Sequence, residues 1–133
     1  MDSVLLDTDV FSFFFKRDSR RELYAPDVAG RRLCISFMTV AELKRWAIER
    51  SWGEARRERL VQTLRNFVVL PYDNAMADAW AETAVARKRA GRPISCGDCW
   101  IAAGALRHGI PLLTHNGKDF EGISGLEVVC REG

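Results

Sequence analysis

Acidic side chains stand beside apolar segments in four parts of this 133-residue chain. Asp7 and Asp9 directly follow a short apolar run, Glu42 and Asp98 each fall in the expected first turn of a helix, and Asp119 follows another short apolar run. Carboxylates gathered in one place repel one another unless cations neutralise them. Oxygen ligands at such density suit Mg²⁺ or Mn²⁺ rather than zinc. If the fold brings these acids together, they predict a site for a hard divalent cation.

The elements that carry the acids alternate in type along the chain. We expect strands at residues 4–6, 33–37, 67–70, 112–113 and 126–129. Helices are expected at residues 10–15, from residue 39 to a break at Gly53, and at residues 74–90 and 95–109. After Gly53 we expect a further amphipathic helix, with Leu60, Val61, Leu64 and Phe67 on one face. Residues 19–30 suggest a short helical hairpin that is broken at Pro26.

This alternation predicts one α/β domain over residues 1–133, built as a three-layer α/β/α sandwich on a mostly parallel sheet of four to five strands. Ligands of such sheets bind beyond the carboxyl ends of the strands, where the strand order reverses. The acids all fall toward that edge, so we expect them to share one site.

Most of these acids also have a local explanation when each is taken alone. Glu42 could close a capping box with Thr39, and Asp98 has the same spacing from Ser95. Asp9 could cap the first helix, and Asp119 could belong to a simple turn. Asp7 resists this explanation because it ends a buried strand, where a carboxylate needs a partner or a metal.

The four cysteines do not suggest a zinc site, since Cys96 and Cys99 form a single C-x-x-C pair. His108 and His115, the two histidines, are at unsuitable spacing. We expect plain buried thiols. No apolar run approaches the roughly 20 residues of a membrane helix, and no secretory signal is visible, so a cytoplasmic setting is the default expectation.

The net charge of +2 is unevenly distributed. Residues 16–65 hold thirteen Lys and Arg against seven Asp and Glu, which is consistent with a polyanionic partner or with solvated helix faces. An unusual number of aromatic residues could form a partner groove or dimer face, or could simply pack in the core: Phe13, Phe14, Phe15, Trp46 and Trp52.

Four segments resemble the motifs of PIN domains, in the order that this family shows. Residues 4–10, VLLDTDV, are similar to the opening motif LLDTN or LLDTD, and residues 35–43 resemble the second motif of the family. Asp98 and the residues that follow it, up to WIAA, resemble the third motif, D-x-x-I-A-A. Residues 113–120 resemble the fourth motif, T-x-N-x-x-D-F. The matches span nearly the whole chain. The length and single-domain build look like VapC-type toxins.

The resemblance implies a pocket that binds Mg²⁺ or Mn²⁺ and hydrolyses RNA by a metal-activated water. Asp7, Glu42, Asp98 and Asp119 would be the catalytic and metal-binding acids. It also implies a homodimer, inhibited by a cognate VapB-like antitoxin. Supporting polar groups would be Thr8, Asp9, Thr114 and Asn116. The basic character of the chain suggests that the RNA backbone could be held by Lys44, Arg45 and Arg92, although each of these could equally be an ordinary exposed residue of a helix or loop.

The chain departs from the family pattern at two positions. Asp9 stands where the family often has Asn, and His115 stands where an arginine often follows the threonine of the fourth motif. Other functions stay open at this stage. They are a PIN nuclease of RNA maturation, a haloacid-dehalogenase-like phosphatase with Asp7 as nucleophile, and a non-catalytic module that binds RNA or protein.

Overall fold

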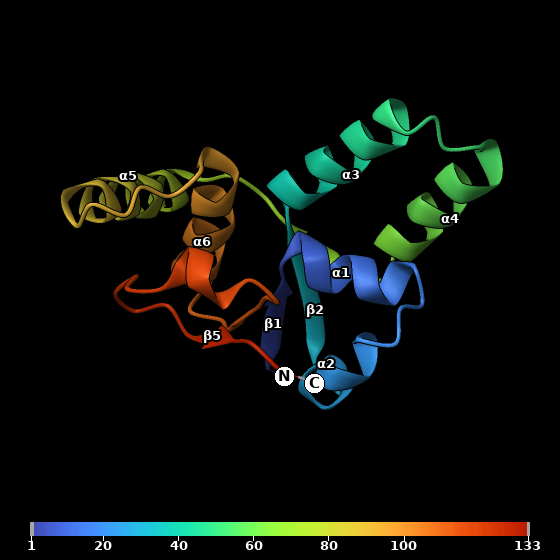
Figure 1. The fold of residues 1–133 in the computed structure, drawn as a ribbon, viewed down its shortest axis with the longest axis horizontal. Helices are drawn as coiled ribbons and strands as arrows, with labels where there is room; N and C mark the ends of the chain where they lie inside the picture. Colours follow the sequence, from blue (N-terminus) through green and yellow to red (C-terminus); the bar gives the residue numbers. More distant parts are fainter. Residues whose placement is uncertain (1, 133) are drawn as a thin grey trace.

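The computed structural model describes residues 2–132 and places a parallel sheet between two groups of helices (Figure 1). The strands are β1 (Ser3–Leu6), β2 (Arg32–Ser36), β3 (Val68–Leu70), β4 (Leu112–Leu113) and β5 (Val128–Val129). The helices are α1 (Thr8–Phe15), α2 (Arg21–Val28), α3 (Phe37–Glu49), α4 (Glu54–Leu64), α5 (Asn74–Arg89) and α6 (Cys96–His108), with the 3-10 helix η1 (Gly117–Phe120). The predicted three-layer fold is confirmed.

The five strands run in the order β3-β2-β1-β4-β5, and every neighbouring pair is parallel. The chain builds outward from β1 to β2 and β3, then crosses over to add β4 and β5 on the other side. The strand order therefore reverses between β1 and β4. Beyond the carboxyl ends of these two strands lies the crevice in which sheets of this kind bind ligands.

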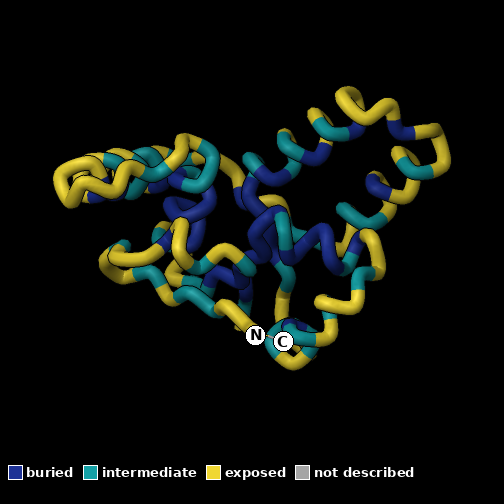
Figure 2. The backbone as a smooth tube through the Cα atoms, viewed as in Figure 1, coloured by how far each residue is buried: buried dark blue, intermediate teal, exposed yellow. Residues whose placement is uncertain are grey.

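Alternate residues of each strand supply two separate cores. Leu6 and Ile35 face the cluster formed with α1 to α4, whereas Leu5 and Cys34 face the cluster that includes α6. Strands β1 and β4 and the helices α1 and α6 contain the most buried parts of the chain (Figure 2). Both faces of β1 are thus covered, which explains its unbroken apolar sequence.

The aromatic residues expected either in the core or at a partner surface belong to the core. Phe13, Phe15 and Trp52 are buried in the cluster on the α1 side of the sheet. Phe14 and Trp46 are partly buried and pack against the same cluster. Core packing is therefore sufficient to explain this part of the composition.

The predicted boundary between the second strand and its helix was wrong. Strand β2 ends at Ser36, and α3 begins at Phe37 rather than at Thr39. The Ser36 hydroxyl caps α3 by accepting a hydrogen bond from the backbone N–H of Met38 at 3.0 Å. The capping box considered for Thr39 and Glu42 does not form, because both residues lie inside the helix.

Two other expectations need correction. Helix α2 runs unbroken through Pro26, instead of forming a hairpin that breaks there. In α4, Leu60 is buried as expected, but Val61 is 46% exposed and Phe67 lies beyond the end of the helix. The amphipathic face of α4 is therefore narrower than the sequence pattern suggested.

The cysteines are free, and they divide into two kinds. Cys34 and Cys99 are buried, as predicted, while Cys96 and Cys130 are exposed, contrary to the prediction. Within residues 2–132, none of the helices combines the length and the apolar character required to cross a bilayer.

Candidate functional site

Asp7 lies at the centre of the candidate site. It follows β1 directly, caps α1 and is only 6% exposed. Its Oδ1 accepts a hydrogen bond from the backbone N–H of Thr8 at 2.8 Å, and its Oδ2 accepts one from the Thr114 hydroxyl at 2.7 Å. Thr114 immediately follows β4 and is fully buried. The two residues therefore join the carboxyl ends of β1 and β4, where the strand order reverses.

Glu42 reaches this centre from the neighbouring strand–helix unit. The Thr8 hydroxyl donates to Glu42 Oε1 at 3.1 Å and lies 3.0 Å from the hydroxyl oxygen of Thr39. Thr39 and Glu42 are one helical turn apart on α3, so both face α1. The sequence pattern pointed to Glu42 but offered no role for Thr39 beyond capping.

Asp9 connects α1 to the loop that follows β4. Its Oδ2 accepts hydrogen bonds from the His115 backbone N–H at 3.0 Å and from Asn116 Nδ2 at 3.1 Å. Its Oδ1 accepts from the backbone N–H of Val10 at 2.7 Å. Asp9 does not cap α1 as considered from the sequence, since Asp7 is the capping residue. Two of its three hydrogen bonds fix the loop that leads toward Asp119.

Asp98 and Asp119 come from α6 and η1. Asp98 is half-buried in the first turn of α6, where its backbone N–H donates to the Ser95 hydroxyl at 3.2 Å. Ser95 thus caps α6, and a hydrogen bond from its side chain partly offsets the rise that burial causes in the pKa of Asp98. Asp119 lies on η1 and is exposed.

The pKa values of four of the acids are raised, those of Asp7, Asp9, Glu42 and Asp98. Burial, with Asp9 as the next largest cause, raises the pKa of Asp7 from 3.8 to about 7. Burial also raises the pKa values of Asp9, Glu42 and Asp98. Asp98 further raises the pKa of Glu42, and Asp119 raises that of Asp98, so these carboxylates are close enough to repel one another. A bound cation would relieve this repulsion.

The donor chemistry fits Mg²⁺ or Mn²⁺, although the side chains are not yet gathered around one point. Within the described part of the chain, no three His, Cys, Asp or Glu side chains are close enough together to hold one ion as they stand. Both oxygens of Asp7 are engaged in hydrogen bonds. Asp98 and Asp119 are more accessible, so a cation shared by these acids would require the side chains of Asp98 and Asp119 to turn toward Asp7.

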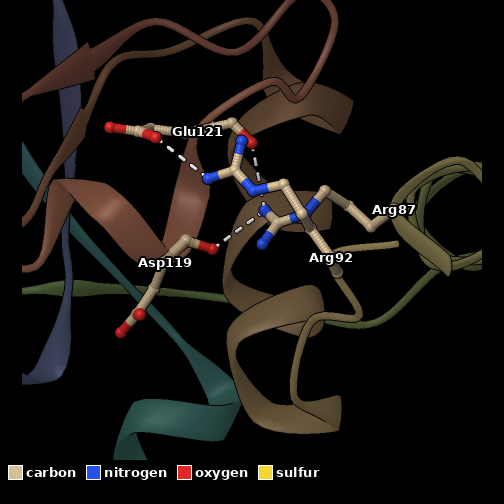
Figure 3. A network of polar contacts seen from close by, with 4 residues as sticks. All are labelled: Arg87, Arg92, Asp119 and Glu121. Carbon is tan, nitrogen blue, oxygen red and sulfur yellow. Dashed lines mark hydrogen bonds and ion pairs between the residues drawn. The ribbon is translucent and has the colours of Figure 1, made fainter. Parts of the chain in front are cut away.

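Two buried residues of the surrounding shell were missed by the sequence reasoning. Tyr24 is fully buried, and its hydroxyl lies 2.7 Å from His115 Nδ1, which holds that ring beneath the loop. Arg87 is 7% exposed and donates hydrogen bonds to backbone carbonyls around η1 (Figure 3). Neither residue belongs to one of the four motifs. The sequence offers only one indication of their burial, which is that each is a polar residue in a helix that also carries apolar residues.

Of the three cations suggested for RNA binding, Lys44 and Arg45 are neighbours on α3, Arg92 follows α5, and two of the three have acidic partners. Arg45 pairs with Glu49 at 3.2 Å along α3, and Arg92 pairs with Glu121 at 2.9 Å. Lys44 is exposed on α3. Exposed ion pairs of this kind are weak and exchange readily, so an RNA contact by these residues stays a prediction.

The sequence of the chain matches a known family over most of its length, since the family model described as PIN domain matches residues 4–126. The chain belongs to the PIN-domain family. This finding confirms the resemblance inferred from the four motifs. All the acids of the candidate site fall inside the matched range.

Relatives of this PIN-domain protein include ribonucleases. It is 34% identical to Ribonuclease VapC1 of Haemophilus influenzae strain R2866, with 92% of this chain and 93% of the relative covered. It is 32% identical to the tRNA(fMet)-specific endonuclease VapC of Shigella flexneri, with 92% of each covered. Among solved structures, it is similar to VapBC-1 from nontypeable Haemophilus influenzae, with a TM-score of 0.80, 28% identity, and 96% of this chain and 97% of that chain covered.

Proposed function

We propose that this PIN-domain protein is a metal-dependent endoribonuclease that hydrolyses RNA phosphodiester bonds, and that it is the toxin of a toxin–antitoxin pair. The observation that carries the proposal is the placement of Asp7 and Thr114 at the reversal of strand order, with Glu42, Asp98 and Asp119 around them. Named ribonucleases of the same length and family support the reaction class.

Asp7, Glu42, Asp98 and Asp119 would hold Mg²⁺ or Mn²⁺. When bound, the cation neutralises charge on the phosphate and makes a water molecule more acidic. A carboxylate of this set would accept the proton of the attacking water. Thr8 and Thr114 orient Glu42 and Asp7 through their hydroxyls. Water would attack the phosphorus directly while the bond to the leaving oxygen breaks and that oxygen takes up a proton, so the reaction needs no covalent enzyme intermediate.

The partners follow from the relatives and the charge pattern. Similar chains have been solved as VapBC complexes, and we propose a VapB-like antitoxin and a homodimer for this protein in the cytoplasm. The basic stretch of residues 16–65 would bind the RNA backbone, which predicts binding that weakens as salt increases. Lys44, Arg45 and Arg92 are the proposed contacts.

The first test is cleavage of labelled single-stranded RNA and of a tRNA pool, with Mn²⁺, Mg²⁺ or EDTA. The Asp98→Asn variant keeps the shape of the side chain but removes its charge. Asp78→Asn is the matched control, because Asp78 is an exposed aspartate on α5 and is not among the proposed ligands. We expect metal-dependent cleavage by the native protein and the control, and at least a hundredfold loss in D98N. Equal cleavage by D98N would contradict the proposed site.

A further inference from the structure

Asp119 differs from the other proposed ligands, because it lies neither at the end of a strand nor on an α-helix. It lies on a four-residue 3-10 helix, and its side chain is exposed. Its backbone N–H donates to the Asn116 carbonyl at 3.0 Å, and the next residue, Phe120, is 2% exposed in the core on the α6 side. The position of the Asp119 carboxylate is therefore set by what holds its backbone.

Arg87, at the end of α5, supplies most of the remaining polar contacts. Its Nη1 donates to the carbonyl of Asp119 at 3.0 Å and to that of Glu121 at 3.2 Å. Its Nε donates to the carbonyl of Arg92 at 2.7 Å. Figure 3 shows this guanidinium between the two chain segments, with the exposed Arg92–Glu121 ion pair beside it. A buried guanidinium is expensive unless it is hydrogen-bonded, so these contacts are strongly favoured.

The contacts of Arg87 join the segments from which two of the acids come. Residue 92 belongs to the short connection that leads to Ser95, the cap of α6, and Asp98 stands in the first turn of that helix. Residues 119 and 121 lie on or next to η1. One side chain thus fixes the spacing between the start of α6 and η1, although no part of Arg87 itself belongs to the ligand set.

We propose that Arg87 is a positioning residue that sets the place of Asp119 relative to Asp98. The inference rests on the proposed function, since it assigns a role toward the same acidic site. The role requires the planar fork of arginine, because two separate nitrogens bind carbonyls on opposite segments. A lysine keeps the charge but directs it from a single atom and cannot hold both segments in the same way.

The test compares Arg87→Lys with the native protein and with Arg107→Gln. Arg107 is the matched control because it forms an exposed ion pair with Asp73 on the same pair of helices. Each protein is assayed for Mn²⁺ affinity without RNA, for kcat at saturating Mn²⁺, and for amide hydrogen exchange in residues 117–122. R87K is expected to weaken Mn²⁺ binding or lower kcat by about tenfold to a hundredfold, as outer-shell changes do at metal sites. Exchange in residues 117–122 should accelerate, and R107Q should change none of the three.

A purely structural role for Arg87 gives a different result. R87K would then lower the melting temperature, while the folded protein would retain native Mn²⁺ affinity, kcat and exchange in residues 117–122. That outcome overturns the proposal. A double-mutant cycle with Asp119→Asn separates the two roles further. R87K should reduce kcat much less in the D119N protein than in the native protein, because the carboxylate that Arg87 positions has already been removed.

Failure of the proposed function can be recognised separately. Absence of metal-dependent cleavage by the native protein counts against the nuclease, whereas hydrogen exchange still decides whether Arg87 fixes η1. If R87K does not fold, hydrogen exchange of Arg87 and Asp119 can be measured in the native protein instead. The Arg87 Nε–H, which donates to the Arg92 carbonyl, should be at least as protected as the Asp119 amide once each exchange rate is divided by its intrinsic value, because a side chain that fixes η1 cannot open more often than η1 does. Protection at least a hundredfold lower at Arg87 would overturn the proposal.

Discussion

The Thr114 hydroxyl donates to Asp7 Oδ2 at 2.7 Å and joins the ends of two neighbouring strands that are 107 residues apart in sequence. The same hydroxyl oxygen accepts a hydrogen bond from the Asn116 backbone N–H at 3.1 Å. One buried side chain therefore holds both the central carboxylate and the start of the loop toward Asp119.

Replacing Thr114 by Val should impair both stability and activity. The change keeps the shape but leaves a buried carboxylate and an amide N–H without their partner, which costs about 1–3 kcal/mol for each such group. We expect a lower free energy of unfolding in urea and at least a tenfold loss of metal-dependent cleavage. Thr83→Val is the control, because Thr83 is also a buried threonine but lies on α5, outside the candidate site. Similar losses of cleavage in both variants would contradict the assigned role.

Asp7→Asn should stabilise the metal-free protein at neutral pH. The pKa of Asp7 is raised to about 7 by burial and by Asp9, so the folded state favours the protonated acid. The stabilisation from that protonated form is complete below about pH 4 and is lost as the pH rises through 7. Each unit of pKa shift corresponds to about 1.4 kcal/mol, so the difference at pH 8 is on the order of a few kcal/mol before screening.

The measurement is the melting temperature of both proteins in EDTA between pH 4 and pH 8. D7N should exceed the native protein at pH 8, and the two should converge toward pH 4. Mn²⁺ should then raise the melting temperature of the native protein but not that of D7N, because binding to the folded state adds stability. A native protein that is more stable than D7N at pH 8 in EDTA would show that the ionised carboxylate is already compensated.

Tyr24→Phe should destabilise the protein although Tyr24 is not a proposed ligand. Its hydroxyl lies 2.7 Å from His115 Nδ1, donates to the Thr114 carbonyl at 3.2 Å and accepts from the Arg131 N–H at 3.0 Å. Loss of this buried hydroxyl should lower the free energy of unfolding, measured in urea, by about 1–3 kcal/mol. Tyr72→Phe, at a residue that is 56% exposed, should stay within about 0.5 kcal/mol. Equal effects would mean that the buried contacts contribute nothing.

Two glycines of the α6 region should respond in opposite ways to alanine. At Gly104 a Cβ would meet Leu70, Met76 and Leu5 at 3.7–3.9 Å, which is ordinary packing, so G104A should gain about 0.5–1 kcal/mol from helix propensity. Gly109 has a φ of +63° after the end of α6, where an L side chain is strained, and G109A should cost about 1–2 kcal/mol. Urea unfolding of both variants measures the pair, and a destabilised G104A would show that α6 cannot accept even one methyl group.

The sequence by itself determined the fold class, the strand positions and the acids at the strand ends. Apolar periodicity is local, so it identifies β1 and β4 and therefore the residues that follow them, Asp7 and Thr114. The order of four motifs determined the PIN resemblance. Locating Asp98 and Asp119 near the same edge required only that the sheet be parallel, which the alternation of strands and helices predicts.

Only the tertiary structure decided how those acids are held. Thr39 turned out to face Thr8 rather than to cap a helix, and Asp9 turned out to hold the loop after β4. The roles of Tyr24 and Arg87 could not be predicted, because their partners include backbone carbonyls that are 90 and 32 residues away. Every residue carries such a carbonyl, so the sequence has no signal for which one a buried side chain will reach.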